Sequence, residues 1–402
     1  MTSATARRLT AGAPAIAEAH FRAEADPYDP ERNPDGYLNL GTAENRLVWD
    51  LLAPRLAACP PLTGDAARYG PLYGTPEFRR RVAAFLGPHV DPGDLVVVSG
   101  ATAALDVVAT ALCDPGEVIV TPAPYYGAFD VDLAGRSGAR LRPAAGGAFE
   151  IDPAAVACAI TEARRDGLVV RAIAISSPHN PLGVVHPRQL LRELAQVAAE
   201  LDVDVISDEI YANCVFGRTP FTPMAGLPGS PLPAHRVHTV WGFAKDFGLP
   251  GFKAGVLHTT DPAVRAAARE LAYFAPLSTQ TQSTLGELLG DAAWIAAFLA
   301  ESADRLGRSY AAAAALLDAH AIEYVPAEAG FSIFARLSDA ECPDEELRLW
   351  RELLERLRVS ILPGRLFHCP RPGWFRVCHS VPAATVRTAL TRVGAHLARA
   401  AR

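Results

Sequence analysis

A chain of 402 residues, half of them hydrophobic, can bury a large core, most simply divided between one large and one smaller domain. The net charge of −6 argues against nucleic acid as a partner, and no apolar run approaches the roughly 20 residues needed to span a membrane. The first residues lack a signal-peptide pattern, and the seven cysteines form no CxxC pair. We therefore expect a cytoplasmic, reduced protein with no metal site.

Apolar runs of strand type alternate with helical patterns through the first two thirds of the chain. Strands are predicted at 95–99, 117–122, 169–178, 203–211 and 236–244, and helices at 100–112 and 190–202. This alternation predicts an α/β fold with a mainly parallel sheet that helices cover on both faces. Ligands of such sheets gather at the carboxyl ends of the strands, and the motifs described below lie there.

The pattern changes near residue 262. Helices are predicted at 263–274, 292–320 and 344–357, and strand-like segments at 330–337 and 375–380. We expect a large domain over 46–265 and a smaller α+β domain over 266–402, against which the N-terminal segment 1–45 packs.

Lysine is nearly absent from this chain. Of 38 basic side chains only Lys245 and Lys253 are lysine, and the rest are arginine. Arginine stays protonated, whereas a deprotonated lysine can attack a carbonyl group and form an imine. Lys245 lies just after an apolar strand, in WGFAKDFGLPGFKAG, where a glycine-rich turn lets the backbone approach a ligand. The alternative is that the two lysines have no special role, and that their codons were simply not replaced by arginine codons as the composition shifted towards arginine.

Polar side chains at other strand ends complete a possible cofactor site. Asp208, in VISDEIY, follows a buried strand, where a carboxylate without a cation would be costly, and Tyr211 comes three residues later. Asp208 could instead cap a helix. Asn180 lies in the turn NPLG, a weak signal by itself. Tyr126 is a candidate to stack on a ring, with Tyr125 as its competitor.

Anion-binding groups are also present. The segment SGATAA opens a helix, so the backbone N–H groups of Ala101 and Thr102 can bind a phosphate. Tyr69 and Tyr73 are candidates for a further phosphate donor. Arg376, in GWFRVC, can grip an α-carboxylate with two parallel hydrogen bonds. An imine-forming lysine, a carboxylate for a ring nitrogen, a stacking ring and a phosphate cradle are what pyridoxal 5′-phosphate (PLP) needs.

The order of these motifs resembles the class I/II aminotransferase superfamily, PLP enzymes of fold type I. The resemblance is closest to the 1-aminocyclopropane-1-carboxylate (ACC) synthase branch, and covers roughly residues 35–385. It rests on NLGTAENRL at 39–47, YGTPEFR at 73–79, SDEIYANCVF at 207–216, LSTQTQ at 277–282 and LFHCPRPGWFRVC at 366–378. It implies a seven-stranded sheet in the large domain and a homodimer with a shared active site.

The resemblance also assigns roles. It implies that Lys245 carries the cofactor as a Schiff base and then removes the Cα proton, that Asp208 pairs with the pyridine nitrogen, and that Asn180 and Tyr211 contact O3′. Tyr126 would stack on the ring, and Ala101 and Thr102 would bind phosphate. The substrate would meet Arg376 through its carboxylate and Glu44 where relatives recognise S-adenosylmethionine. Tyr69 or Tyr73, and the segment 278–282, would reach the neighbouring subunit's site.

Three positions depart from the family pattern. Gly242 stands where a serine hydroxyl is expected to bind phosphate, in Gly242-Phe243-Ala244-Lys245. Lys253 stands in place of an arginine, which turns a bidentate clamp into a point charge. Arg46 replaces glutamine in AENQL, near the expected substrate pocket.

These residues predict an enzyme that removes the Cα proton of an α-amino acid, with S-adenosylmethionine as the suspected substrate. Loss of methylthioadenosine from Cγ would be followed by cyclisation, or by elimination and capture of a nucleophile. The alternatives are an aminotransferase and a non-catalytic binding module of the same fold, which would not require Lys245.

Overall fold

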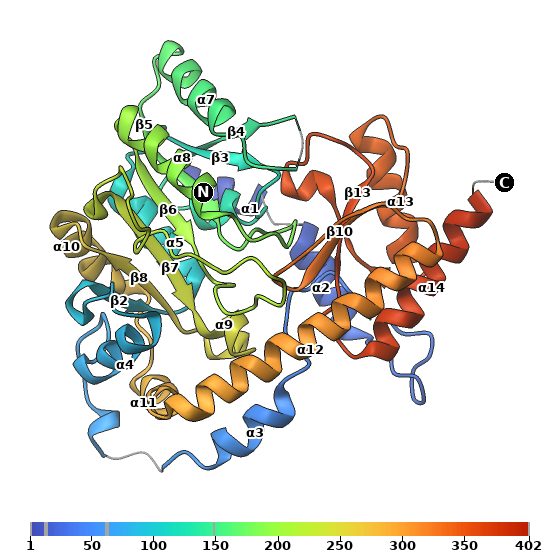
Figure 1. Ribbon diagram of the computed structural model, residues 1–402, viewed down its shortest axis with the longest axis horizontal. Helices are drawn as coiled ribbons and strands as arrows, with labels where there is room; N and C mark the ends of the chain where they lie inside the picture. The colour runs from blue at the N-terminus through green and yellow to red at the C-terminus, as the bar shows by residue number, and fades with distance from the viewer. Residues whose placement is uncertain (1, 12–14, 61–63, 148, 401–402) are drawn as a thin grey trace.

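The computed structural model describes residues 2–11, 15–60, 64–147 and 149–400. A seven-stranded sheet forms the larger of its two packed parts, with strand order β2-β8-β7-β6-β5-β3-β4 (Figure 1). The strands are β2 (Leu95–Val98), β3 (Val118–Ala123), β4 (Arg140–Ala145), β5 (Val170–Ser176), β6 (Asp204–Asp208), β7 (Val237–Gly242) and β8 (Gly255–Thr259). Strand β8 is antiparallel to both neighbours, and every other pair is parallel.

The α/β fold with a mainly parallel, seven-stranded sheet is therefore confirmed, although two strands had no signal of their own. Strand β4 is an edge strand, RLRPAA, whose arginines and proline hide the apolar pattern. Strand β8 is fully buried but short, and it follows the glycine-rich turn after Lys245 directly.

Helices cover both faces of this sheet. Val118 and Val120 of β3 pack towards α7 (Pro153–Arg165) and α8 (Arg188–Glu200), whereas Ile119 packs towards α5 (Ala101–Leu112) and α10 (Pro262–Leu271). Alternate side chains of a strand point to opposite faces, so a continuous apolar run suits a sheet covered on both sides. A third core joins the edge of the sheet at β2 and β8 to helices α3 (Trp49–Ala57), α4 (Pro76–Leu86) and α11 (Thr279–Leu289).

The smaller part is built around an antiparallel sheet of order β12-β13-β10-β9. Its strands are β9 (Tyr324–Val325), β10 (Ser332–Arg336), β12 (Leu362–Pro363) and β13 (Trp374–Cys378), flanked by helices α13 (Pro343–Glu355) and α14 (Ala383–Ala400). Strand β1 (Leu38–Asn39) pairs in parallel with β11 (Val359–Ser360), and α2 (Ala15–Ala25) contributes Ala19 and Ala23 to the same core. A further N-terminal helix is α1 (Ala4–Ala11).

The long helix α12 (Ala292–Ala319) joins the two parts (Figure 1). Ile295 and Phe298, near its start, belong to the core beside the large sheet, whereas Ala313 and Leu317 belong to the core of the smaller part. The division of the chain at residues 45 and 265 stays a prediction. Among the described helices, none is long and apolar enough to cross a membrane.

Candidate active site

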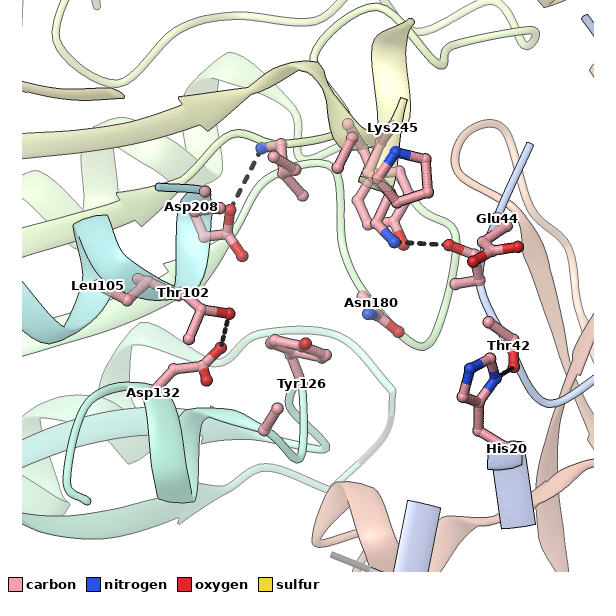
Figure 2. A pocket seen from close by; sticks show the side chains of 18 of the residues that line it. His20, Thr42, Glu44, Thr102, Leu105, Tyr126, Asp132, Asn180, Asp208 and Lys245 are labelled. Carbon is pink, nitrogen blue, oxygen red and sulfur yellow. Dashed lines mark hydrogen bonds between the residues drawn. The ribbon is translucent and has the colours of Figure 1, made fainter. Parts of the chain in front are cut away.

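A cavity of about 400 Å³ opens at the carboxyl ends of the large sheet's strands, between that sheet and the smaller part (Figure 2). Ten of the residues predicted for the site line this one cavity: Glu44, Ala101, Thr102, Tyr126, Asn180, Asp208, Tyr211, Lys245, Lys253 and Arg376. They come from segments more than 300 residues apart in the chain. The geometry below shows how each is held.

Lys245 lies on the one-turn helix α9 (Phe243–Asp246), which follows β7 directly. Its Nζ donates a hydrogen bond to the carbonyl oxygen of Ala43 at 2.5 Å and lies 5.9 Å from the centre of the Tyr211 ring. Burial, and then the nearby positive charge of Arg376, lower the pKa of the Lys245 amine. A lowered pKa increases the neutral fraction of the amine, the form that can attack a carbonyl or accept a proton.

Asp208 is the last residue of β6 and is only 5% exposed. Its Oδ1 accepts a hydrogen bond from the N–H of Ile210 at 3.2 Å, so the carboxyl group caps a turn rather than a helix. Burial raises the pKa of Asp208 to about 7. A buried carboxyl group keeps its proton when no cation is close, and the pyridine nitrogen of PLP would restore its charge. This position fits the predicted cofactor.

Arg376 and Asn180 are hydrogen-bonded to each other in the wall of the cavity. Nη1 of Arg376 donates to Oδ1 of Asn180 at 3.1 Å, and Nη2 donates to the carbonyl oxygen of Gly41 at 2.6 Å. Arg376 is 4% exposed, and its Nε has no hydrogen-bond partner among the described residues. An incompletely satisfied buried guanidinium is suited to bind a carboxylate.

The structure separates the two adjacent tyrosines. Tyr126 lines the cavity, whereas Tyr125 stacks on His368, with the ring centres 4.4 Å apart, and donates to Oδ1 of Asp130 at 2.8 Å. Tyr126 therefore remains the candidate for stacking on the cofactor ring.

Helix α5 begins at the end of the cavity where the phosphate is expected. Gly255, on β8, leaves room for this helix start, because a side chain there would collide with the backbone of Gly100 and Ala101. A Cβ atom built on Gly100 would lie 3.8 Å from Nζ of Lys253, so this ammonium group lies beside the helix N-terminus. The free N–H groups of the first turn and a nearby cation suit a phosphate.

The packing around position 242 explains why this chain has glycine there instead of serine. A Cβ atom at this position would lie 2.6 Å from the carbonyl oxygen of Ala254 and 3.3 Å from Cδ1 of Ile210. The space in which a serine side chain would begin is therefore taken by backbone. The absence of a hydroxyl group here follows from the close approach of β7 and β8.

We expect Gly242→Ser to destabilise the protein by about 1–3 kcal/mol, because the overpacked strand pair must move apart. The added hydroxyl should not increase PLP affinity. Thermal unfolding and cofactor titration check both points. Gly251→Ser is the matched control, since a Cβ atom there meets nothing within 4 Å. Tighter cofactor binding at unchanged stability would contradict this account.

Glu44 lies on the cavity wall near the N-terminal helix α2. Its Oε2 accepts a hydrogen bond from Nε of Arg46 at 3.2 Å, and Nη2 of Arg46 also reaches Oε1 of Glu24 at 2.7 Å. Arg46 does not line the cavity, so its predicted influence on substrate would pass through Glu44. Two carboxylates share one guanidinium here, which leaves a net negative charge at this end of the site.

Tyr69 and Tyr73 do not line the cavity of their own chain. Tyr69 is fully exposed. The guanidinium carbons of Arg79 and Arg269 lie 5.2 and 4.7 Å from the centre of the Tyr73 ring. In the 278–282 segment, Gln282 is buried and its Oε1 accepts from the N–H of Thr75 at 2.8 Å. Contact of these residues with a neighbouring subunit stays a prediction.

Sequence reasoning missed three polar residues of the cavity: Asp132, His20 and Thr42. Asp132 ends the short helix α6 (Phe129–Asp132), and its place between Val131 and Leu133 was the available signal. Nδ1 of His20 lies 2.7 Å from Oγ1 of Thr42 (Figure 2). No pattern in the Ala-rich N-terminal segment pointed to His20.

Comparison with known proteins identifies the fold and the family of this chain. The fold is that of PLP-dependent enzymes of fold type I: aspartate aminotransferase from Thermus thermophilus superposes over 98% of this chain and 100% of its own, with a TM-score of 0.82 at 24% identity. Over residues 37–393 the chain matches the family described as aminotransferase class I and II, and it belongs to that family.

Among curated relatives, 1-aminocyclopropane-1-carboxylate synthase 3 of Oryza sativa subsp. japonica is 36% identical over 92% of this chain and 89% of its own length. The 1-aminocyclopropane-1-carboxylate synthase of Glycine max is 33% identical over 92% of this chain and 82% of its own. The chain is therefore an ACC synthase-like member of a PLP-dependent family.

Proposed function

We propose that the protein binds PLP in this cavity through Lys245 and acts on S-adenosylmethionine, with loss of methylthioadenosine from Cγ. When bound, the cofactor would supply an electron sink for the negative charge that develops at Cα. Two outcomes fit this proposal: closure of a cyclopropane ring, or elimination followed by replacement at Cγ.

The chain's own residues would orient the substrate and move its proton. Arg376 would hold the α-carboxylate with two parallel hydrogen bonds, next to the amide of Asn180. Lys245 would then accept the Cα proton at Nζ, for which its lowered pKa is favourable. Asp208 would keep the ring nitrogen protonated, and Tyr126 would fix the plane of the ring.

The position of Glu44 supports S-adenosylmethionine as the substrate. This carboxylate lies on the same cavity wall as Ala43, whose carbonyl oxygen accepts the hydrogen bond from Lys245. A sulfonium group on Cγ carries a positive charge, which the net negative cluster of Glu44, Glu24 and Arg46 would stabilise. The similarity to ACC synthases supports the same substrate.

Incubation of the PLP-loaded protein with S-adenosylmethionine tests the proposal. We expect methylthioadenosine together with a cyclic or Cγ-substituted amino acid, detected by mass. Glu44→Gln should raise KM for S-adenosylmethionine by on the order of tenfold, because the carboxylate charge is lost. Glu323→Gln, which loses an exposed carboxylate paired with Arg336, is the matched control and should not change KM.

Absence of methylthioadenosine would contradict the proposal that S-adenosylmethionine is the substrate. If ordinary amino acids instead yield keto acids and the aminated cofactor, the protein is an aminotransferase. The same Arg376 and Lys245 geometry would serve that reaction, so the two candidates differ in what the Glu44 end of the cavity recognises.

A further inference from the structure

Asp132 places a second buried carboxyl group in the cofactor cavity. It is 7% exposed, and its Oδ2 accepts a hydrogen bond from Oγ1 of Thr102 at 3.3 Å (Figure 2). Thr102 is the second residue of α5, whose first turn faces the expected phosphate position. Asp132 therefore lies at the phosphate end of the cavity, not at the substrate end.

The surroundings of Asp132 favour its neutral form. The carboxylates of Asp208, at the end of β6, and Asp106, on α5, repel a negative charge here, and Lys253 attracts one. Burial, and then the negative charges of Asp132 and Asp208, raise the pKa of the Tyr126 phenol. Burial is also the largest influence on Asp132. It outweighs the hydrogen bond from Thr102 and the charge of Lys253, which favour the carboxylate, and the pKa of Asp132 is raised to about 7.

A bound phosphate would further favour the protonated form of Asp132 over the ionised form. An ionised carboxylate beside a phosphate dianion would repel it across a poorly hydrated space. A protonated carboxyl group instead offers an O–H donor, and the dianion would favour that proton. The phosphate also lacks a hydroxyl donor at Gly242, where a side chain is blocked by the Ala254 carbonyl oxygen.

We propose that Asp132 binds the phosphate of the cofactor as a neutral carboxylic acid, and thereby replaces the hydroxyl donor that position 242 cannot provide. This proposal rests on the PLP site but not on the identity of the amino-acid substrate. The cofactor should therefore bind with uptake of a proton by Asp132 when the free protein holds this group ionised.

Equilibrium titration of the cofactor-free protein tests this role without measuring activity. PLP and, separately, inorganic phosphate are titrated into wild type, Asp132→Asn and Asp132→Ala. Asparagine keeps a neutral hydrogen-bond donor, so Asp132→Asn should bind both probes within about threefold of wild type near neutral pH. Asp132→Ala should bind them about tenfold more weakly.

The pH dependence separates a neutral acid from an ionised carboxylate. Because only the protonated form binds, wild-type affinity should fall above about pH 7, by up to tenfold per pH unit relative to Asp132→Asn. This ratio removes the titration of PLP itself, which both proteins share. Calorimetry of PLP binding at about pH 8, in two buffers with different ionisation enthalpies, should show that wild type takes up about one more proton than Asp132→Asn.

Asp130→Asn is the matched control. Asp130 accepts from Tyr125 and contacts His368, and it does not line the cavity. Circular dichroism confirms that each variant is folded. The proposal is overturned if both Asp132 variants bind the probes as tightly as wild type or more tightly, or if the affinities of wild type and Asp132→Asn change in parallel with pH. Failure of wild type to bind PLP would overturn the cofactor site too. Binding without methylthioadenosine formation would overturn only the choice of substrate.

Discussion

Lys245→Ala is expected to lose covalent attachment of PLP and nearly all activity. Loss of the proton acceptor alone lowers kcat by about 10²–10⁴-fold, and loss of covalent binding adds to this. The visible absorbance of covalently held PLP should disappear from the purified variant. A well-folded wild type that shows no such absorbance after incubation with PLP would overturn the assignment of Lys245.

The scarcity of lysine makes this experiment unusually clean. Because Lys245 and Lys253 are the only lysines, borohydride reduction of the PLP-loaded protein should add the cofactor's mass to one peptide alone. That peptide should contain Lys245. Lys253→Arg keeps the positive charge beside α5 and should still be labelled at Lys245. Label at Lys253 in wild type would contradict the geometry of both side chains.

Asp208→Asn should be the second most damaging substitution. If Asp208 pairs with the protonated ring nitrogen, its loss leaves a buried cation unpaired, at a cost of about 3–5 kcal/mol. This corresponds to a fall in activity of about 10²–10⁴-fold. Saturating PLP should not rescue the rate, because the defect lies in the ring's protonation and not only in binding. Asp339→Asn, an exposed carboxylate paired with Arg336, should be unaffected.

Although Asp208→Asn should lower activity, it should raise the free energy of unfolding of the cofactor-free protein at neutral pH. Burial holds the folded-state pKa of Asp208 at about 7, above its ordinary value of 3.8. Between these values the folded state binds more protons than the unfolded state, so this group's contribution to the free energy of unfolding falls as pH rises from about 4 to about 7. The contribution of this one group falls by about 1.4 kcal/mol per pH unit in this range, and Asp208→Asn should remove that fall. Denaturant unfolding at several pH values measures it, and identical slopes would contradict the buried, unpaired state of Asp208.

Much of the site could be predicted because its residue types carry unusual chemistry at strand ends. Lys245 in a chain of arginines, Asp208 after an apolar strand and the small residues that open α5 each require a special environment. The edge strand β4 and the antiparallel strand β8 escaped prediction, since neither offers a separate, extended apolar run. Asp132 was not predicted because the sequence FDVDL does not reveal which of its two aspartates, Asp130 or Asp132, faces a cavity.

The alternation of strands and helices, the family, and the groups able to bind a cofactor could all be predicted from the amino-acid sequence, because they follow from local periodicity and side-chain chemistry. Only the packing of distant segments shows that Tyr126 and not Tyr125 lines the cavity, and that a Cβ atom at Gly242 would crowd the carbonyl oxygen of Ala254. The packing also places the carboxyl group of Asp132 in this cavity, next to the hydroxyl group of Thr102. These outcomes depend on strands, turns and helix ends that are distant in the chain. Only their packing fixes which atoms meet and which charges are buried.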